Sequence, residues 1–250
     1  MSLIHTLTLP DIFELRIHSV FNSNNMTMRK FLIFIVTMTF SLFASGQKNE
    51  PDTVTITTNN YKLIRLKSGG QFGFGVAENY YGSKTKNWIG NHGSGVFAFQ
   101  FFFGRHNIGG RFKPWTVNPE GNLVFGNDIL TNLATMNVIK GEWFYGYDIE
   151  PIKQLLVEPY ISYLSVSFPV INEDKIGKKY TIPSAHGLGF GVEVKRNCRV
   201  APFQYLVPYL SINVAIIDFT KVNENLDKNF LSWEIGLKYG GWFTKKEVVK

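Results

Sequence analysis

The chain has 250 residues, a formal net charge of +7 and 44% hydrophobic residues, an ordinary hydrophobic content for a folded protein. Its mean hydropathy of -0.04 excludes a bundle of transmembrane helices. Lys and Arg are spread along the sequence without a basic cluster, which argues against nucleic-acid binding. The single cysteine, Cys198, excludes an internal disulfide framework and a paired-cysteine metal site.

Residues 26–46 have the pattern of a secretory signal peptide. A basic start is followed by a short apolar core over residues 31–43 and by small residues before Gln47, the order in which export signals are built. Because this signal begins well inside the chain, we interpret residues 1–25 as an upstream extension. Gln47 is not a cysteine, so a lipoprotein anchor is not expected at this site.

Residues 47–67 are polar and rich in threonine, and we interpret them as a periplasmic N-terminal segment. An alternative is that residues 53–58 and 61–66 are two short strands joined at Asn59-Asn60. A β-barrel formed by the rest of the chain would then have ten strands.

Residues 95–112 give the clearest structural signal, a β-hairpin with one fully apolar face. Four phenylalanines recur at every second position, namely Phe97, Phe99, Phe101 and Phe103. This spacing places them on one face of a strand. A soluble sandwich would bury all four under a second sheet, whereas a membrane barrel turns them to lipid and keeps the alternate polar side chains in its lumen.

The chain from residue 70 onward separates into eight aromatic or glycine-rich segments, at 70–80, 95–103, 108–115, 141–149, 154–168, 187–195, 204–218 and 230–243. Long polar links follow the first, third, fifth and seventh segments, and short links follow the others. Such alternation is expected when one barrel end has tight turns and the other carries surface loops. The sequence therefore predicts an all-β fold, an antiparallel up-and-down transmembrane β-barrel of eight strands over residues 68–244, with a C-terminal tail at 245–250.

The alternation also predicts which side chains face inward and which face outward. The expected charged lumen residues are Arg111, Lys113, Glu142, Asp148, Glu158, Glu193, Lys195, Glu234 and Lys238. The expected lipid-facing or girdle residues are Phe97, Phe99, Phe101, Phe103, Trp143, Tyr145, Tyr147, Trp233, Tyr239 and Phe243. An eight-stranded barrel is only wide enough for its own side chains, so we expect a filled lumen in which opposite charges pair.

The eight-segment pattern and the aromatic last strand, residues 233–243, resemble the small outer-membrane β-barrel proteins of the OmpA transmembrane-domain and OmpX kind. Barrels described generically as outer-membrane β-barrel or PorT-like proteins are similar in style. The resemblance implies a monomer in the outer membrane of a Gram-negative cell, in contact with outer-membrane lipid. It also implies a last strand recognised by the barrel-assembly machinery, with Phe243 in the place of the usual terminal aromatic residue, although Thr244 and six further residues follow it.

Catalysis has one candidate motif, His92-Gly93-Ser94, which has the His-x-Ser spacing of outer-membrane lipid A deacylases. We expect this motif in a loop and not on a lipid-facing strand, so we predict no enzyme, no cofactor and no metal. The favoured function is a structural or surface-interaction role carried by the long loops, with an unknown surface partner and no nucleic acid. The alternatives are a small channel or secretion component, a lipid A-modifying enzyme and a soluble lipocalin-type barrel.

Overall fold

The computed structural model describes residues 55–57, 61–125, 128–131, 133–173 and 179–248. The expected signal peptide at 26–46 and the upstream extension at 1–25 lie outside the described residues. Among the described residues, no helix is long and apolar enough to cross a membrane.

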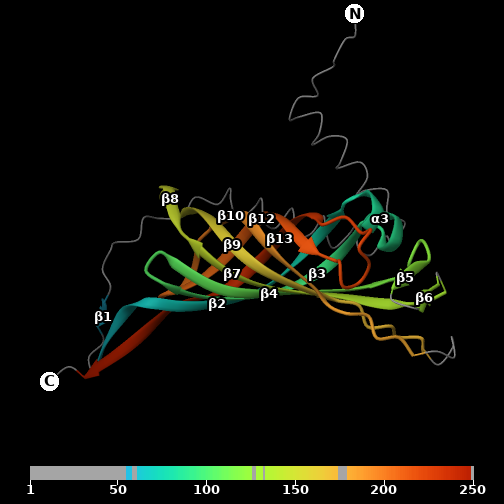
Figure 1. The fold of residues 1–250 in the computed structure, drawn as a ribbon. Coiled ribbons are helices and arrows are strands. Elements are labelled where there is room, and N and C mark those ends of the chain that lie inside the picture. Colours follow the sequence, from blue (N-terminus) through green and yellow to red (C-terminus); the bar gives the residue numbers. More distant parts are fainter. Residues whose placement is uncertain (1–54, 58–60, 126–127, 132, 174–178, 249–250) are drawn as a thin grey trace, which may run out of the picture.

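Eight long strands form one closed barrel (Figure 1). They are β2 (Tyr61–Tyr81), β3 (His92–Phe103), β4 (His106–Val117), β7 (Met136–Tyr147), β9 (Leu155–Ser167), β10 (Ala185–Arg196), β12 (Gln204–Asp218) and β13 (Asn229–Val248). Each pairs antiparallel with the next along the chain, and β13 pairs with β2 to close the wall. The predicted eight-stranded up-and-down barrel is confirmed.

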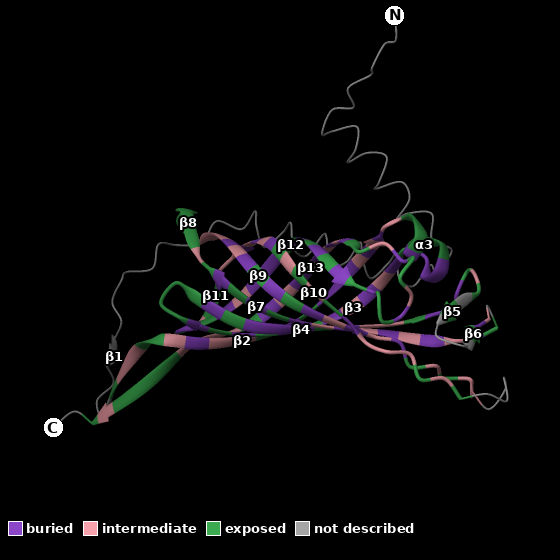
Figure 2. Cartoon of the chain, in the orientation of Figure 1, coloured by how far each residue is buried: buried purple, intermediate pink, exposed green. Residues whose placement is uncertain are grey.

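Buried and exposed side chains alternate along the barrel strands (Figure 2). In β12, for example, Leu210 and Ile212 are exposed, whereas Ser211 and Asn213, which alternate with them, are buried. This alternation follows from the pleat of a strand, which directs successive side chains to opposite faces. The barrel is therefore unusual in its chemistry, because apolar side chains cover the outside and polar ones fill much of the inside.

The connections differ between the two ends of the barrel. At the short-turn end, Gly104-Arg105 joins β3 to β4, with Gly104 in the left-handed region at φ 63°. The other two short connections contain the small strands β8 (Ile149–Ile152) and β11 (Cys198–Ala201). At the loop end lie the helix α3 (Ser83–Ile89) and a hairpin of β5 (Leu123–Phe125) and β6 (Asp128–Leu130).

Two barrel strands continue past the barrel at the short-turn end (Figure 1). Thr244–Val248 of β13 pairs with Tyr61–Arg65 of β2, and β1 (Thr55–Thr57) pairs with β2 on its other side. The hairpin that could have produced ten strands is thus present, but it forms part of this ribbon and not of the barrel wall. The expected barrel bounds at residues 68 and 244 fall inside continuous strands.

The loop end is closed by a folded apolar cap that the sequence analysis did not foresee. Trp88 and Ile89 of α3, with Phe219 of the last long loop, pack on barrel side chains such as Leu164 and Val166. We call the buried cluster the cap core; it comprises Tyr81, Trp88, Ile89, Val117, Leu130, Ala134, Met136, Val138, Leu164, Val166, Phe168, Ala185, Ala215, Ile217, Phe219, Val222, Leu226 and Phe230.

The helix α3 is fastened by a residue far along the chain. Asp227 Oδ2 accepts hydrogen bonds from the Lys84 backbone N–H at 2.6 Å and from Ser83 Oγ at 3.3 Å. The Asp227 backbone oxygen also accepts one from Thr85 Oγ1 at 2.9 Å. Since Gly82 at the start of the helix has no side chain to cap it, Asp227 satisfies one of the free N–H groups of the first turn from another loop.

We expect Asp227→Ala to loosen α3 from the barrel by about 1 kcal/mol, the usual effect of removing a helix cap. Hydrogen exchange at the α3 amides should become faster by the corresponding factor of about five. The matched control is Asp218→Ala, which removes an exposed carboxylate paired with Lys228 at 3.5 Å and should leave exchange in α3 unchanged. Equal exchange in Asp227→Ala and the parent protein would contradict this account of the cap.

Candidate functional site

The barrel interior below the cap core holds a dense set of charged side chains. We call it the lumen network; it comprises Gln100, Arg111, Lys113, Glu142, Glu158, Glu193, Lys195, Glu234 and Lys238, all buried. These residues come from β3, β4, β7, β9, β10 and β13, and each points inward because it shares the inner parity of its strand. The expected charged lumen residues all lie here, with Asp148 at the rim.

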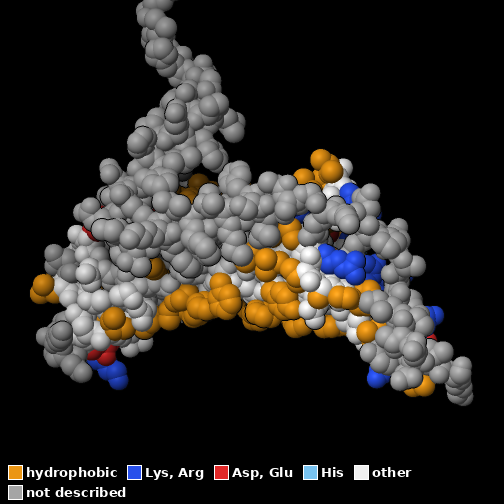
Figure 3. Space-filling model, turned by 180° about the vertical axis from the view of Figure 1, so that it is seen from behind, with side chains coloured by type: hydrophobic (Ala, Val, Ile, Leu, Met, Phe, Trp, Pro, Cys, Tyr) orange, Lys and Arg blue, Asp and Glu red, His pale blue; other side chains and the backbone are white. Residues whose placement is uncertain are grey.

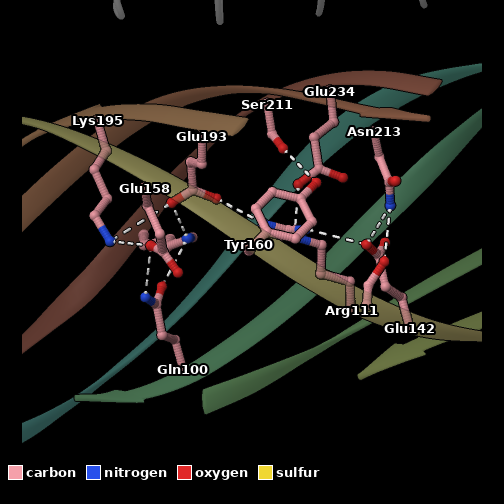
Figure 4. A network of polar contacts seen from close by, with 12 residues as sticks. Gln100, Arg111, Glu142, Glu158, Tyr160, Glu193, Lys195, Ser211, Asn213 and Glu234 are labelled. Atoms are coloured by element: carbon pink, nitrogen blue, oxygen red, sulfur yellow. Dashed lines mark hydrogen bonds and ion pairs between the residues drawn. The ribbon is translucent and has the colours of Figure 1, made fainter. Parts of the chain in front are cut away.

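Arg111 is the centre of this network (Figure 4). Its Nη2 lies 2.8 Å from Glu193 Oε2, its Nη1 lies 3.3 Å from Glu142 Oε1, and its Nε lies 3.0 Å from Glu234 Oε1. The three carboxylates belong to three different strands. A planar guanidinium with several fixed donors suits such a junction better than an ammonium group would.

Two aromatic rings enclose the same guanidinium. The Arg111 Cζ atom lies 4.4 Å from the ring centre of Phe144 and 4.6 Å from that of Tyr160. The rings find room because they lie against glycines: a Cβ at Gly109 would come within 2.6 Å of Phe144, and one at Gly191 within 2.3 Å of Tyr160. Each ring thus occupies the space that the absent side chain of a glycine leaves on the neighbouring strand.

Lys113 and Lys238 extend the network to either side of Arg111. Lys113 Nζ lies 3.1 Å from Glu142 Oε2 and 2.6 Å from Glu234 Oε2. Lys238 Nζ lies 2.5 Å from Glu193 Oε1 and donates a hydrogen bond to Gln100 Oε1 at 2.9 Å. Glu142 and Glu234 therefore each contact two cations, and Glu193 contacts three, since Lys195 Nζ also lies 4.0 Å from its Oε1.

Lys195 links the network to the short-turn end. Its Nζ pairs with Glu158 and lies 2.8 Å from Asp148 Oδ1. Gln100 Nε2 also donates a hydrogen bond to Glu158 Oε2 at 3.0 Å, so the Glu158 carboxylate contacts both Lys195 and Gln100. Asp148 is the most exposed of the nine expected lumen charges, with 14% of its side chain exposed, whereas none of the others exceeds 2%.

Lys140 is a buried cation that the sequence analysis missed. Its Nζ donates to Asn79 Oδ1 at 2.8 Å and lies 3.9 Å from the ring centre of Phe230, at the border of the cap core. The strand predicted from the sequence starts at residue 141, one residue too late to include Lys140, whereas β7 starts at Met136. Lys140 lies two residues before Glu142, so the alternation of a strand directs both side chains to the same face, towards the lumen. This spacing is the feature of the sequence that could have identified Lys140.

The outside of the barrel carries a continuous apolar surface between its two ends (Figure 3). We call it the apolar belt; its exposed members are Phe72, Phe74, Phe97, Phe99, Phe101, Phe103, Ile108, Phe112, Trp143, Tyr145, Tyr147, Ile161, Tyr163, Leu188, Phe190, Leu210, Ile212, Val214, Ile216, Tyr239 and Phe243. All eight barrel strands contribute. Of the expected outward residues, only Trp233 is half-buried; it lies on the outer face between Glu78 and Ile212.

The His92-Gly93-Ser94 motif lies at the start of β3 and not in a loop, which corrects the expectation. Both His92 and Ser94 face the interior and are buried. Asn79 Nδ2 donates to Ser94 Oγ at 3.1 Å and to the His92 backbone oxygen at 3.2 Å, while His92 Nδ1 has no partner among the described residues. The hydrogen-bond partner of the Ser94 hydroxyl among the described residues is therefore Asn79 and not His92.

Other reactive groups form no site in the described part of the chain. No three His, Cys, Asp or Glu side chains there come together as a metal site. Cys198 lies in the β11 connection, where burial raises the pKa of its thiol. A raised thiol pKa reduces the thiolate fraction and so the reactivity of this cysteine at neutral pH.

We expect Glu193→Gln to lower the free energy of unfolding by about 3 to 5 kcal/mol, because it leaves Arg111 and Lys238 short of one buried negative charge. Urea unfolding in lipid vesicles, followed by tryptophan fluorescence, measures the change. The double variant Glu193→Gln with Lys238→Met restores the charge balance and should be less destabilised than the single variant.

The control is Glu247→Gln, which breaks an exposed ion pair with Lys245 at 3.1 Å. This change should cost less than about 1 kcal/mol, as exposed pairs do. Equal effects of Glu193→Gln and Glu247→Gln would mean that the buried carboxylate does not hold the network together.

No family model and no curated protein matches the chain. Among solved structures, it is similar to Ail, the attachment invasion locus protein of Yersinia pestis, with 12% identity, 73% of this chain and 99% of that chain covered, and a TM-score of 0.43. It is also similar to neisserial surface protein A (12% identity, 71% and 97%, TM-score 0.41) and to the outer membrane protein AlkL (9% identity, 80% and 98%, TM-score 0.41). These likenesses concern the fold alone.

Proposed function

We propose that this protein is an integral outer-membrane β-barrel with a closed, ion-paired lumen and a structural or surface-interaction role carried by its loop end. The observation that carries the proposal is the apolar belt, to which all eight barrel strands contribute, while the charges lie inside. Water would favour the opposite arrangement, because exposed apolar surface is costly and buried charges need partners. Lipid favours the arrangement observed.

The backbone supports the same environment. In a bilayer every backbone N–H and C=O group must find a partner within the protein, and a closed barrel provides this because it has no free edge. The β2–β13 pairing closes this wall along Gly69–Tyr81 of β2. The strands contain 12 to 21 residues, more than the roughly 9 to 11 that a tilted transmembrane strand needs.

The two ends support an orientation and a mode of assembly. Tight turns at one end and long structured loops at the other match outer-membrane barrels, whose loops face the exterior. An export signal at residues 26–46 supports passage to that membrane. The aromatic strand β13, with Phe243 exposed, supports recognition by the barrel-assembly machinery, and a belt formed by all eight strands supports a monomer.

The loop end supports an interaction role over an enzymatic one. The cap core holds α3 and parts of the long loops in a fixed arrangement, so the surface above it is formed before any partner binds. Preformed surfaces lose less conformational entropy on binding than flexible loops do. The buried His92 and Ser94, by contrast, lie below this cap and face no lipid.

We expect Phe99→Arg to impair insertion into vesicles, because a cation in the middle of the belt costs about 2 to 4 kcal/mol. The assay is refolding into phosphatidylcholine vesicles, followed by gel mobility with and without boiling. The matched control is Val124→Arg, since Val124 is exposed at 54% on the loop hairpin and Phe99 at 41% on the belt. Equal refolding of the two variants would show that the belt does not face lipid.

We also expect the folded protein to give no discrete conductance steps in planar bilayers. The side chains of the lumen network and of the cap core are buried inside the barrel, the cap core at the loop end. Reproducible steps from heat-modifiable, correctly folded protein would support the channel alternative and contradict a closed lumen.

A further inference from the structure

Positive charge gathers at the short-turn end of the barrel. The described cations there are Lys62, Arg65, Lys67, Arg105, Lys153, Arg196, Arg199, Lys245 and Lys246. The described carboxylates at the same end, outside the lumen network, are Asp148 at the rim, Glu150 and Glu247. Asp148 pairs with Lys195 and Glu247 with Lys245. Figure 3 shows Lys and Arg side chains at this end of the molecule, beside the apolar belt. In the sequence these residues are scattered over nearly two hundred positions, and the barrel brings them together.

The cations come from several separate elements at this end. Each short connection carries one, at Arg105, Lys153 and Arg199. The ribbon formed by the ends of β2 and β13 carries the largest group, in which Lys245 pairs with Ile64 and Lys246 with Leu63 in the strand register. The charge therefore surrounds the barrel end and does not belong to one loop.

These cations begin where the apolar belt ends. Arg105 follows Phe103 by two residues, and Lys245 follows Phe243 by two residues. The same holds for smaller exposed apolar residues, since Lys153 directly follows Ile152. Side chains of this length reach from an apolar surface to the level of lipid headgroups while keeping their charge in a polar layer.

The loop end has no such excess. Its described exposed cations are Lys84, Lys86, Lys179, Lys221 and Lys228, and its described acidic residues outside the lumen are Glu78, Glu120, Asp128, Glu173, Asp218, Glu224 and Asp227. The excess of positive charge is thus confined to the short-turn end. An even distribution of basic residues over the surface would not produce this difference between the two ends.

We infer that the short-turn end binds the phosphodiester headgroups of anionic phospholipids in the leaflet that surrounds it. This inference rests on the proposed function, because it requires the belt to lie in a bilayer. A soluble acidic partner would not need the cations to follow the edge of the belt around the barrel. Each basic residue close to an anionic membrane surface adds to the attraction, so a ring of them selects anionic over zwitterionic lipid.

The test compares the lipids that stay bound to the protein. The full chain is refolded into vesicles containing equal amounts of phosphatidylglycerol and phosphatidylcholine with the same acyl chains, released in mild detergent and examined by native mass spectrometry. The ribbon variant carries Lys62→Gln, Lys67→Gln, Lys245→Gln and Lys246→Gln. The control variant carries Lys84→Gln, Lys86→Gln, Lys179→Gln and Lys221→Gln, the same change in charge at the loop end.

We expect the parent and the control variant to retain phosphatidylglycerol several-fold over phosphatidylcholine, and the ribbon variant to lose most of this preference. A parent protein without preference, or an equal loss in both variants, would overturn the inference and leave the basic end to a soluble acidic partner. If the ribbon variant does not refold, Arg105→Gln with Lys153→Gln and Arg199→Gln replaces it, with the same expected loss.

A separate experiment tests the proposed function itself, namely that the apolar belt lies in a bilayer. Refolding of the parent into pure phosphatidylcholine vesicles, read by the gel shift on boiling, reports whether the belt enters a bilayer. Insertion without selection of phosphatidylglycerol overturns only the headgroup inference. No insertion overturns both.

Discussion

The lumen network packs four cations and four carboxylates into the narrow space inside this barrel, and each ion would cost several kcal/mol without a partner. Arg111 solves most of this problem, because its guanidinium contacts carboxylates from three strands and lies between two aromatic rings. Such a network can form only when the wall is closed, since its members come from six different strands. The pairing of β13 with β2 and the ion pairing inside the lumen therefore stabilise each other.

With the charges inside, the apolar side chains have only the outer face left. The belt follows from the same alternation that directs Arg111 and Lys113 inward, so lumen and belt are two consequences of one strand pattern. The interior is nevertheless not uniform. At the loop end the cap core fills the interior with apolar side chains from loops and strands. Lys140 lies at the border between the cap core and the lumen network.

Much of this architecture was predictable from the sequence, because period-two alternation is a local property of each strand. The strand β12 was predicted at its observed bounds, and the facing of Glu193 and Lys195 followed from spacing alone. Contacts between distant residues were not predictable in this way. The Asp227 cap on α3, the ribbon between Thr244–Val248 and Tyr61–Arg65, and the gathering of cations at one end all depend on which strands become neighbours. A sequence in which basic residues look evenly spread can therefore fold into a barrel with one basic end.

The most direct measurement of the central claim is the environment of each residue along β3. Single cysteines at positions 97 to 103, in a chain with Cys198→Ser, carry a spin label in phosphatidylcholine vesicles. Collisions with oxygen report lipid, and collisions with a water-soluble nickel complex report solvent. The account predicts high oxygen access at 97, 99, 101 and 103 and little access to either reagent at 98, 100 and 102. Nickel access at the odd positions would show that the belt faces water, and nickel access at position 100 would show that the lumen is open.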